Sequence, residues 1–97
     1  MHVNKATYFN DYKIELLFND GRRGVADLSQ ILHGVFEPLK DKLLFSRFKV
    51  DNELDTIIWE NGADIAPEYL YFLSFKDEPD LQEKFKNWGY ITALSES

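Results

Sequence analysis

Residues 56–71 constrain the fold more than any other part of the chain. Thr56-Ile57-Ile58-Trp59 is a short β-branched and aromatic run, which predicts a buried strand. Asn61-Gly62 predicts a turn, because this dipeptide accepts the positive φ angles that tight turns need. Pro67 suits the first turn of a helix, where its missing N–H costs nothing. A strand followed at once by a turn and a helix indicates mixed α and β structure.

The first third of the chain predicts an antiparallel meander. In the first strand, alternation predicts one face carrying Val3, Lys5, Thr7 and Phe9. In the second, from Tyr12 to Phe18, the apolar face is formed by Tyr12, Ile14, Leu16 and Phe18. Asn19-Asp20-Gly21 predicts a tight hairpin leading into a third strand from Arg22 to Ala26.

The middle of the chain predicts short helices and a second hairpin. Asp27 is suited to cap a short helix over Leu28–Leu32, and a further helical turn follows from Phe36 to Leu44. Phe45–Val50 and Thr56–Trp59 predict two strands joined by a loop. The sequence therefore predicts an α+β fold, with a small antiparallel sheet (meander plus hairpin) packed with short helices and a C-terminal helix.

The C-terminal helix is predicted after Pro79, with Asp80 as its cap and Gly89 as its end. Leu81, Phe85 and Trp88 share one helical face. Two interpretations stay open: this face closes the core of its own chain, or it is an exposed strip for a second copy or a foreign partner. Residues 90–97 are predicted to be a loosely held tail.

Charge is unevenly distributed along the chain. Residues 1–49 carry eight Lys/Arg and six Asp/Glu, whereas residues 50–97 carry three and eleven, so the net charge of −6 comes from the second half. Such a half repels phosphate backbones and attracts a basic partner. The first residues contain no apolar run and no stretch is long enough for a membrane helix, so we expect a cytoplasmic protein.

The residues offer little support for catalysis or metal binding. The chain has no cysteine, which excludes disulfides and thiolate chemistry. His33 has only Asp27 and Glu37 near it in sequence, which is not a metal signature. The acidic run that begins at Asp51 lacks the glycine and the final glutamate of a calcium loop. We therefore expect no catalytic residue, no metal and no cofactor.

Two further residue sets carry alternative hypotheses. Trp59 is interpreted as a core aromatic, with a ligand-stacking role as the alternative, and Asp64 is expected to cap the Pro67 helix or to fix the turn. A small cationic patch for nucleic acid could comprise Arg22, Arg23, Arg47 and Lys49.

Several segments in order resemble the domain of unknown function 2442 (DUF2442) family. They are the strand with Asn19-Asp20-Gly21, the run Val25–Ser29, Phe36-Glu37-Pro38-Leu39, and the stretch from Trp59 through Asn61-Gly62-Ala63-Asp64 to Tyr71. The resemblance covers residues 1–73, and residues 74–97 are interpreted as a helical extension and tail without a domain of their own. The family-motif residues, expected to be structural, are Asp20, Gly21, Trp59, Asn61, Gly62, Asp64 and Tyr71.

The resemblance implies a bacterial α+β domain without established catalytic residues. Some members are joined to a C-terminal helix-turn-helix domain, and others are encoded beside a small protein of the domain of unknown function 4160 family, an arrangement like a toxin–antitoxin pair. Residues 74–97 are too few for a helix-turn-helix.

The leading functional hypothesis is a non-enzymatic interaction module, antitoxin-like or regulatory, that binds a small basic protein. Its apolar anchors would be Leu81, Phe85 and Trp88, with association steered by Asp77, Glu78, Asp80 and Glu83. The alternatives are self-association as a homodimer, a DNA-associated transcriptional regulator using the cationic patch, and a small-ligand-binding domain using Trp59 and Asp64.

Overall fold

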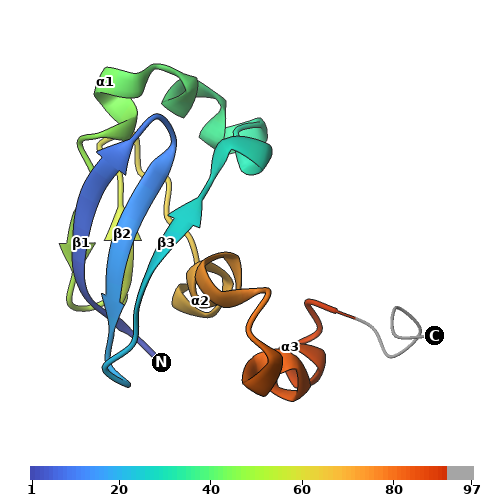
Figure 1. The fold of residues 1–97 in the computed structure, drawn as a ribbon. Helices are drawn as coiled ribbons and strands as arrows, with labels where there is room; N and C mark the ends of the chain where they lie inside the picture. The colour runs from blue at the N-terminus through green and yellow to red at the C-terminus, as the bar shows by residue number, and fades with distance from the viewer. Residues whose placement is uncertain (92–97) are drawn as a thin grey trace.

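The computed structural model describes residues 1–91 and confirms an α+β fold (Figure 1). A three-stranded antiparallel sheet has the order β1-β2-β3, formed by Val3–Asn10, Lys13–Phe18 and Arg23–Asp27. A second sheet is the hairpin of β4 (Lys49–Asp51) and β5 (Thr56–Ile58). The predicted meander and hairpin are therefore both present.

Short helices connect and flank these strands. The 3-10 helices and α-helices are, in chain order, η1 (Ser29–Ile31), η2 (Gly34–Lys40), α1 (Lys42–Phe45), α2 (Pro67–Phe75), η3 (Pro79–Leu81) and α3 (Gln82–Trp88). In Figure 1, α1 lies at one end of the strands, α2 lies beside β3, and α3 lies farther from the sheet. Within residues 1–91, no helix has the length and apolar character needed to cross a bilayer.

The second strand follows its predicted pattern, and the first does not. Ile14, Leu16 and Phe18 are fully buried, as the alternation in β2 predicts. In β1, a bulge between Val3 and Lys5 shifts the register, so Ala6 pairs with the inward-facing Leu16. The predicted face of Val3, Lys5, Thr7 and Phe9 is therefore wrong beyond Val3, and Phe9 is 55% exposed.

The turn between β2 and β3 forms at the predicted Asp-Gly. Gly21 has a φ of 88°, which side chains disfavour. The Gly21 N–H donates to the Phe18 carbonyl at 3.0 Å, and the Phe18 N–H donates to the Arg22 carbonyl at 3.0 Å. The Asp20 carboxylate accepts from the Arg22 N–H at 2.9 Å. These bonds fix the register of the hairpin.

The segment predicted as a strand over Phe45–Val50 is a helix end followed by a short strand. The Asp41 carboxylate accepts from the Leu43 N–H at 3.0 Å and begins α1, which includes Phe45. The strand prediction was wrong at Phe45 because a local cap overrode its β propensity. The Asp27 carboxylate does accept from the Ser29 N–H at 2.9 Å, but the helix that follows is a single 3-10 turn.

The sheet and α2 approach each other closely. The Phe18 ring packs edge-on against Tyr71, whose centroid is 4.9 Å away, and Tyr71 packs in turn against Phe75 at 4.8 Å. Opposite them, Gly24 leaves no room for a side chain: a Cβ placed there would lie 2.6 Å from the Phe75 ring. A glycine in β3 therefore allows α2 to reach the sheet.

The C-terminal helix ends as predicted but begins differently. Gly89 has a φ of 86°, its N–H donates to Lys86, and the Tyr90 N–H donates to the Phe85 carbonyl, a Schellman end. Asp80 does not cap the helix, because neither η3 nor α3 has a side-chain cap. Pro79 starts this segment instead. The predicted tail lies, from residue 92 onward, outside the described residues.

Candidate functional site

The turn after β5 is built by its own polar and glycine residues. The Trp59 N–H donates to the Ala63 carbonyl at 2.9 Å, and the Gly62 N–H donates to the Trp59 carbonyl at 3.0 Å. Gly62 has a φ of 86°, and the Asn61 side-chain oxygen accepts from the Ala63 N–H at 3.1 Å. Asn61 and Gly62 thus shape the backbone of this turn.

Trp59 connects the turn after β5 to α1 through a hydrogen bond and ring contacts. Its ring is only 2% exposed and its Nε1–H donates to the Phe45 carbonyl at 2.8 Å. The rings of Phe36, Phe45 and Phe48 lie around it, with centroids at 6.3, 5.9 and 6.2 Å. A ring enclosed in this way offers no face on which a ligand could stack.

Asp64 lies on the opposite side of the strand from Trp59. Ile58 pairs with Lys49 on one side and with Asp64 on the other, and directly opposed residues point to the same face. Trp59 follows Ile58 and therefore points the other way. A ligand site shared by Trp59 and Asp64 is not formed. Asp64 also does not cap α2, whose N-cap is Ala66 without a side-chain bond.

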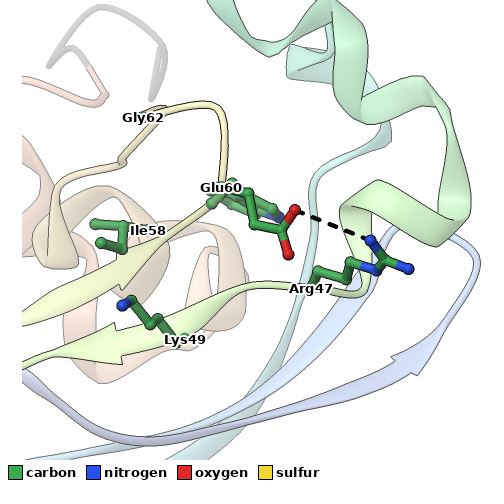
Figure 2. A pocket seen from close by; sticks show the side chains of 6 residues that line it. Arg47, Lys49, Ile58, Glu60 and Gly62 are labelled. Atoms are coloured by element: carbon green, nitrogen blue, oxygen red, sulfur yellow. Dashed lines mark ion pairs between the residues drawn. The ribbon is translucent and has the colours of Figure 1, made fainter.

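A cleft of about 440 Å³ opens on the face that carries Lys49 and Ile58 (Figure 2). It is lined by Arg47, Lys49, Ile58, Trp59, Glu60 and Gly62. The Arg47 guanidinium lies 3.9 Å from the Glu60 carboxylate, which is the limit of an ion pair. Figure 2 shows this pair, with Lys49 and Ile58 to the other side of Glu60 in that view. Pairing of β4 with β5 therefore places two cations beside the family-motif turn.

A second polar cluster joins the β2–β3 hairpin to the C-terminal helices. The Tyr71 hydroxyl donates to Asp20 at 2.6 Å, and Arg22 binds Asp80 at 2.5 Å. The Lys84 ammonium lies 5.6 Å from the centre of the Tyr71 ring. Tyr71 and Asp20, both family-motif residues, thus act together as a structural link.

The electrostatics of this link follow from its contacts. Burial raises the pKa of Tyr71 to about 12, and the hydrogen bond to Asp20 acts in the same direction. Burial alone would raise the pKa of Asp20, but the hydrogen bonds from Tyr71 and the Arg22 N–H, with the Arg22 charge, lower it. Tyr71 stays a neutral donor and Asp20 a charged acceptor.

The four cations of the predicted nucleic-acid patch come from two separate places. Arg23 begins β3 and Arg22 precedes it, whereas Lys49 begins β4 and Arg47 lies in the turn before that strand. The three arginines each face a carboxylate, at 2.5, 3.5 and 3.9 Å: those of Asp80, Glu15 and Glu60. Ion pairs of this kind leave less charge for a phosphate backbone.

The predicted apolar stripe of α3 lies mostly in the core of its own chain. Leu81 is 5% exposed and Phe85 is fully buried, with the Phe85 ring centroid 5.1 Å from that of Phe72. Trp88 is half-buried. Of the two interpretations of the stripe, the structure realises the first for Leu81 and Phe85, so neither side chain is available as a surface anchor.

Of the four acidic residues predicted to steer association with a partner, two lie beside a cation and two do not. Asp80 contacts Arg22, and Glu83 lies 3.7 Å from Lys86. Asp77 and Glu78 are exposed, and neither carboxylate makes an ion pair with any residue in the described part of the chain. Free negative charge therefore remains on the loop between α2 and η3.

An aromatic seam that sequence patterning missed runs between α2 and the end of α3. It consists of the half-buried rings of Tyr69, Phe72, Trp88 and Tyr90. The Tyr90 centroid lies 5.4, 5.2 and 6.2 Å from those of Tyr69, Phe72 and Trp88. Burial, with the charge of Glu68, raises the pKa of Tyr90. The spacing of residues 69 and 72 predicts that their rings share one face of a helix, but no sequence pattern predicts that Tyr90 packs against them.

Comparison with known proteins gives a family and no activity. Residues 3–76 match the family model described as "Protein of unknown function (DUF2442)". No curated protein and no solved structure matches the chain. Within residues 1–91, no three His, Asp or Glu side chains come close enough together to hold a metal ion.

Proposed function

The chain belongs to the DUF2442 family, and we propose that it is a non-enzymatic interaction module, antitoxin-like or regulatory, that binds a small basic protein. The observation that carries the proposal is the outer surface of the C-terminal helices. There the aromatic seam of Tyr69, Phe72, Trp88 and Tyr90 joins α2 to the end of α3, and the loop after α2 carries the exposed carboxylates of Asp77 and Glu78, which make no ion pair within residues 1–91.

This surface has the two properties that a protein-binding site for a basic partner needs. Aromatic side chains that are part-exposed and held rigidly by neighbours are the commonest source of interface energy. Free carboxylates raise the rate of encounter with a positively charged protein. Phe85, packed beneath Phe72, holds the seam in place.

The alternative functions have weaker support. A DNA-associated regulator needs several available cations, and two of the four in the predicted patch, Arg22 and Arg23, lie 2.5 and 3.5 Å from a carboxylate. A ligand site built on Trp59 and Asp64 needs the two side chains on one side of the strand, and they point to opposite faces.

The test uses, as its defined probe, a small basic protein of the domain of unknown function 4160 family, the class of protein that the family resemblance associates with some DUF2442 members. Both proteins are purified separately, and the association rate and the affinity are measured by surface plasmon resonance at several salt concentrations. We expect a complex whose association slows as salt rises, because exposed charges steer the encounter.

Substitutions test whether the partner binds at the aromatic seam and the acidic loop. Trp88→Ala should weaken binding by roughly tenfold or more, as for an interface anchor, and Asp77→Asn with Glu78→Gln should slow association. Glu53→Gln is the matched control, since Glu53 is an equally exposed acid on the β4–β5 loop. Absence of a complex, or a complex indifferent to all three changes, would refute the proposal.

A further inference from the structure

The cleft beside the family-motif turn has features that the proposed function does not use. We propose that it binds an oxyanion group, a carboxylate or a phosphate, through Arg47 and Lys49. This site is independent of the aromatic seam, because its lining comes from the segment before β4, from β4, and from the end of β5 and its turn.

The end of α1 and the start of β4 bring both cations to the cleft. Arg47 lies in the turn that follows α1, where its N–H donates to the Leu44 carbonyl at 3.0 Å, and Lys49 begins β4. Both line the cleft, and Lys49 lies directly opposite Ile58 on β5. Figure 2 shows the two side chains on either side of Glu60, so an oxyanion in the cleft would meet the guanidinium from one side and the ammonium from the other.

The donors of these two cations are available. Neither side chain makes a hydrogen bond to another residue in the described part of the chain. Among residues 1–91, the only carboxylate within 4.0 Å of the Arg47 guanidinium is that of Glu60, at 3.9 Å, whereas a charge-assisted bond of full strength is about 2.7–2.9 Å long. Lys49 has no carboxylate within 4.0 Å among residues 1–91. The planar guanidinium suits two oxygens of one carboxylate or phosphate.

The rest of the cleft is open and partly apolar. Apart from its chain neighbours, nothing lies within 4 Å of the position that a Cβ of Gly62 would occupy. Ile58 supplies an apolar patch beside the cations, which suits a ligand with a short hydrocarbon body next to its charge. The volume of about 440 Å³ lies in the range usual for small-ligand sites.

The negative charge of Glu60 should weaken the binding of an anion in the cleft. Its carboxylate faces Arg47 and would repel an incoming anion, so the affinity of the natural sequence should be modest. Removing this charge while keeping the shape of the side chain should strengthen binding. This opposite response of neighbouring residues distinguishes a site from general attraction of anions to surface cations.

The experiment is a titration followed by amide resonances of the full chain at constant ionic strength. One arm uses inorganic phosphate, a second uses propionate, and a third uses chloride as the control for screening. We expect saturable shifts confined to residues 47–49 and 58–62 in the phosphate or the propionate arm, or in both, and none with chloride. The stronger arm identifies the class of ligand.

Variants complete the test. Arg47→Ala and Lys49→Ala should each weaken binding by roughly tenfold, the size of one charge-assisted hydrogen bond, and Glu60→Gln should strengthen it. Lys13→Ala is the matched control, since Lys13 is a cation of β2 outside this cleft, and it should have no effect. Non-saturating shifts, equal shifts with chloride, or weaker binding by Glu60→Gln would overturn the proposal. The amide spectrum also reports whether each variant is folded.

Discussion

Replacing Gly24 by alanine tests the close approach of α2 to β3. A Cβ at this position would lie 2.6 and 2.8 Å from two atoms of the Phe75 ring and 3.0 Å from the Cβ of Ser74. The Phe75 ring cannot move freely, because it is 8% exposed and packs against Phe18 and Tyr71. Either α2 must shift away from the sheet or the ring must leave its position.

Two effects of opposite sign set the size of the change. Forcing an extra methyl group into a packed core costs about 1–3 kcal/mol. Alanine also restricts the unfolded chain, which stabilises by about 0.4–1 kcal/mol. We therefore expect Gly24→Ala to lower the free energy of unfolding by about 1–2 kcal/mol, since the crowding term is the larger.

Urea and thermal unfolding measure this change. For a domain of this size the loss corresponds to a fall of roughly 5–15 °C in Tm, with an unchanged urea m-value if the unfolded state is unaffected. The control is Gly24→Ala in a Phe75→Leu background, where the smaller side chain leaves room for the methyl group. There the alanine should cost less than it does with Phe75 present. If Gly24→Ala is neutral or stabilising, or costs the same in both backgrounds, crowding by Phe75 is not the reason for glycine at this position.

Substitutions at three further positions test other contacts. Tyr71 has a pKa of about 12 in the folded chain against about 10 when exposed. The stability that its protonated hydroxyl contributes should therefore be fully present below pH 10 and should decline as the pH rises toward 12. Urea unfolding across this range should show a smaller decline for Tyr71→Phe. Gly62→Ala should cost about 1 kcal/mol because φ is positive, and Gly62→Asn should cost less, as thermal melts would show. Trp59→Phe should cost about 1–3 kcal/mol in urea unfolding, because the buried Phe45 carbonyl loses its donor.

The elements that sequence predicted well are those fixed by a local rule. Gly21, Pro67 and Gly89 stand where a turn, a helix start and a helix end require them, and alternation in β2 identified its buried face. The bulge in β1 was not predictable in this way, because it depends on how β1 pairs with β2 and leaves no mark in composition. The pattern of Phe45–Val50 predicts a strand that includes Phe45, and the prediction took no account of Asp41, which caps α1 in the structure.

The polar cluster around Tyr71 and the cleft beside β4 could not be predicted in full, because they are formed by residues that are far apart in the sequence. The Tyr71–Asp20 bond joins residues 51 positions apart, and the Arg22–Asp80 pair joins residues 58 positions apart. Sequence reasoning named Tyr71 and Asp20 as structural but could not connect them. It placed Arg22, Arg23, Arg47 and Lys49 in one patch. In the structure the first two lie at the start of β3, and the last two line the cleft beside Glu60.

The burial of α3 decides where a partner can bind. The family match ends at residue 76, but Phe85 packs against Phe72 and Tyr71, so the core extends through α3. Exposing Leu81 and Phe85 to a partner would first cost about 3–6 kcal/mol, at about 1.5–3 kcal/mol for each buried side chain. That is a large share of the 5–15 kcal/mol that holds a typical domain together. It would also weaken binding by roughly a hundredfold to ten-thousandfold. A partner that docks on the part-exposed Trp88 and leaves α3 in place avoids this cost. Leu81→Ala should therefore act on stability and Trp88→Ala on affinity, and a Leu81→Ala variant that stays fully stable yet loses the partner would place the interface on a released helix.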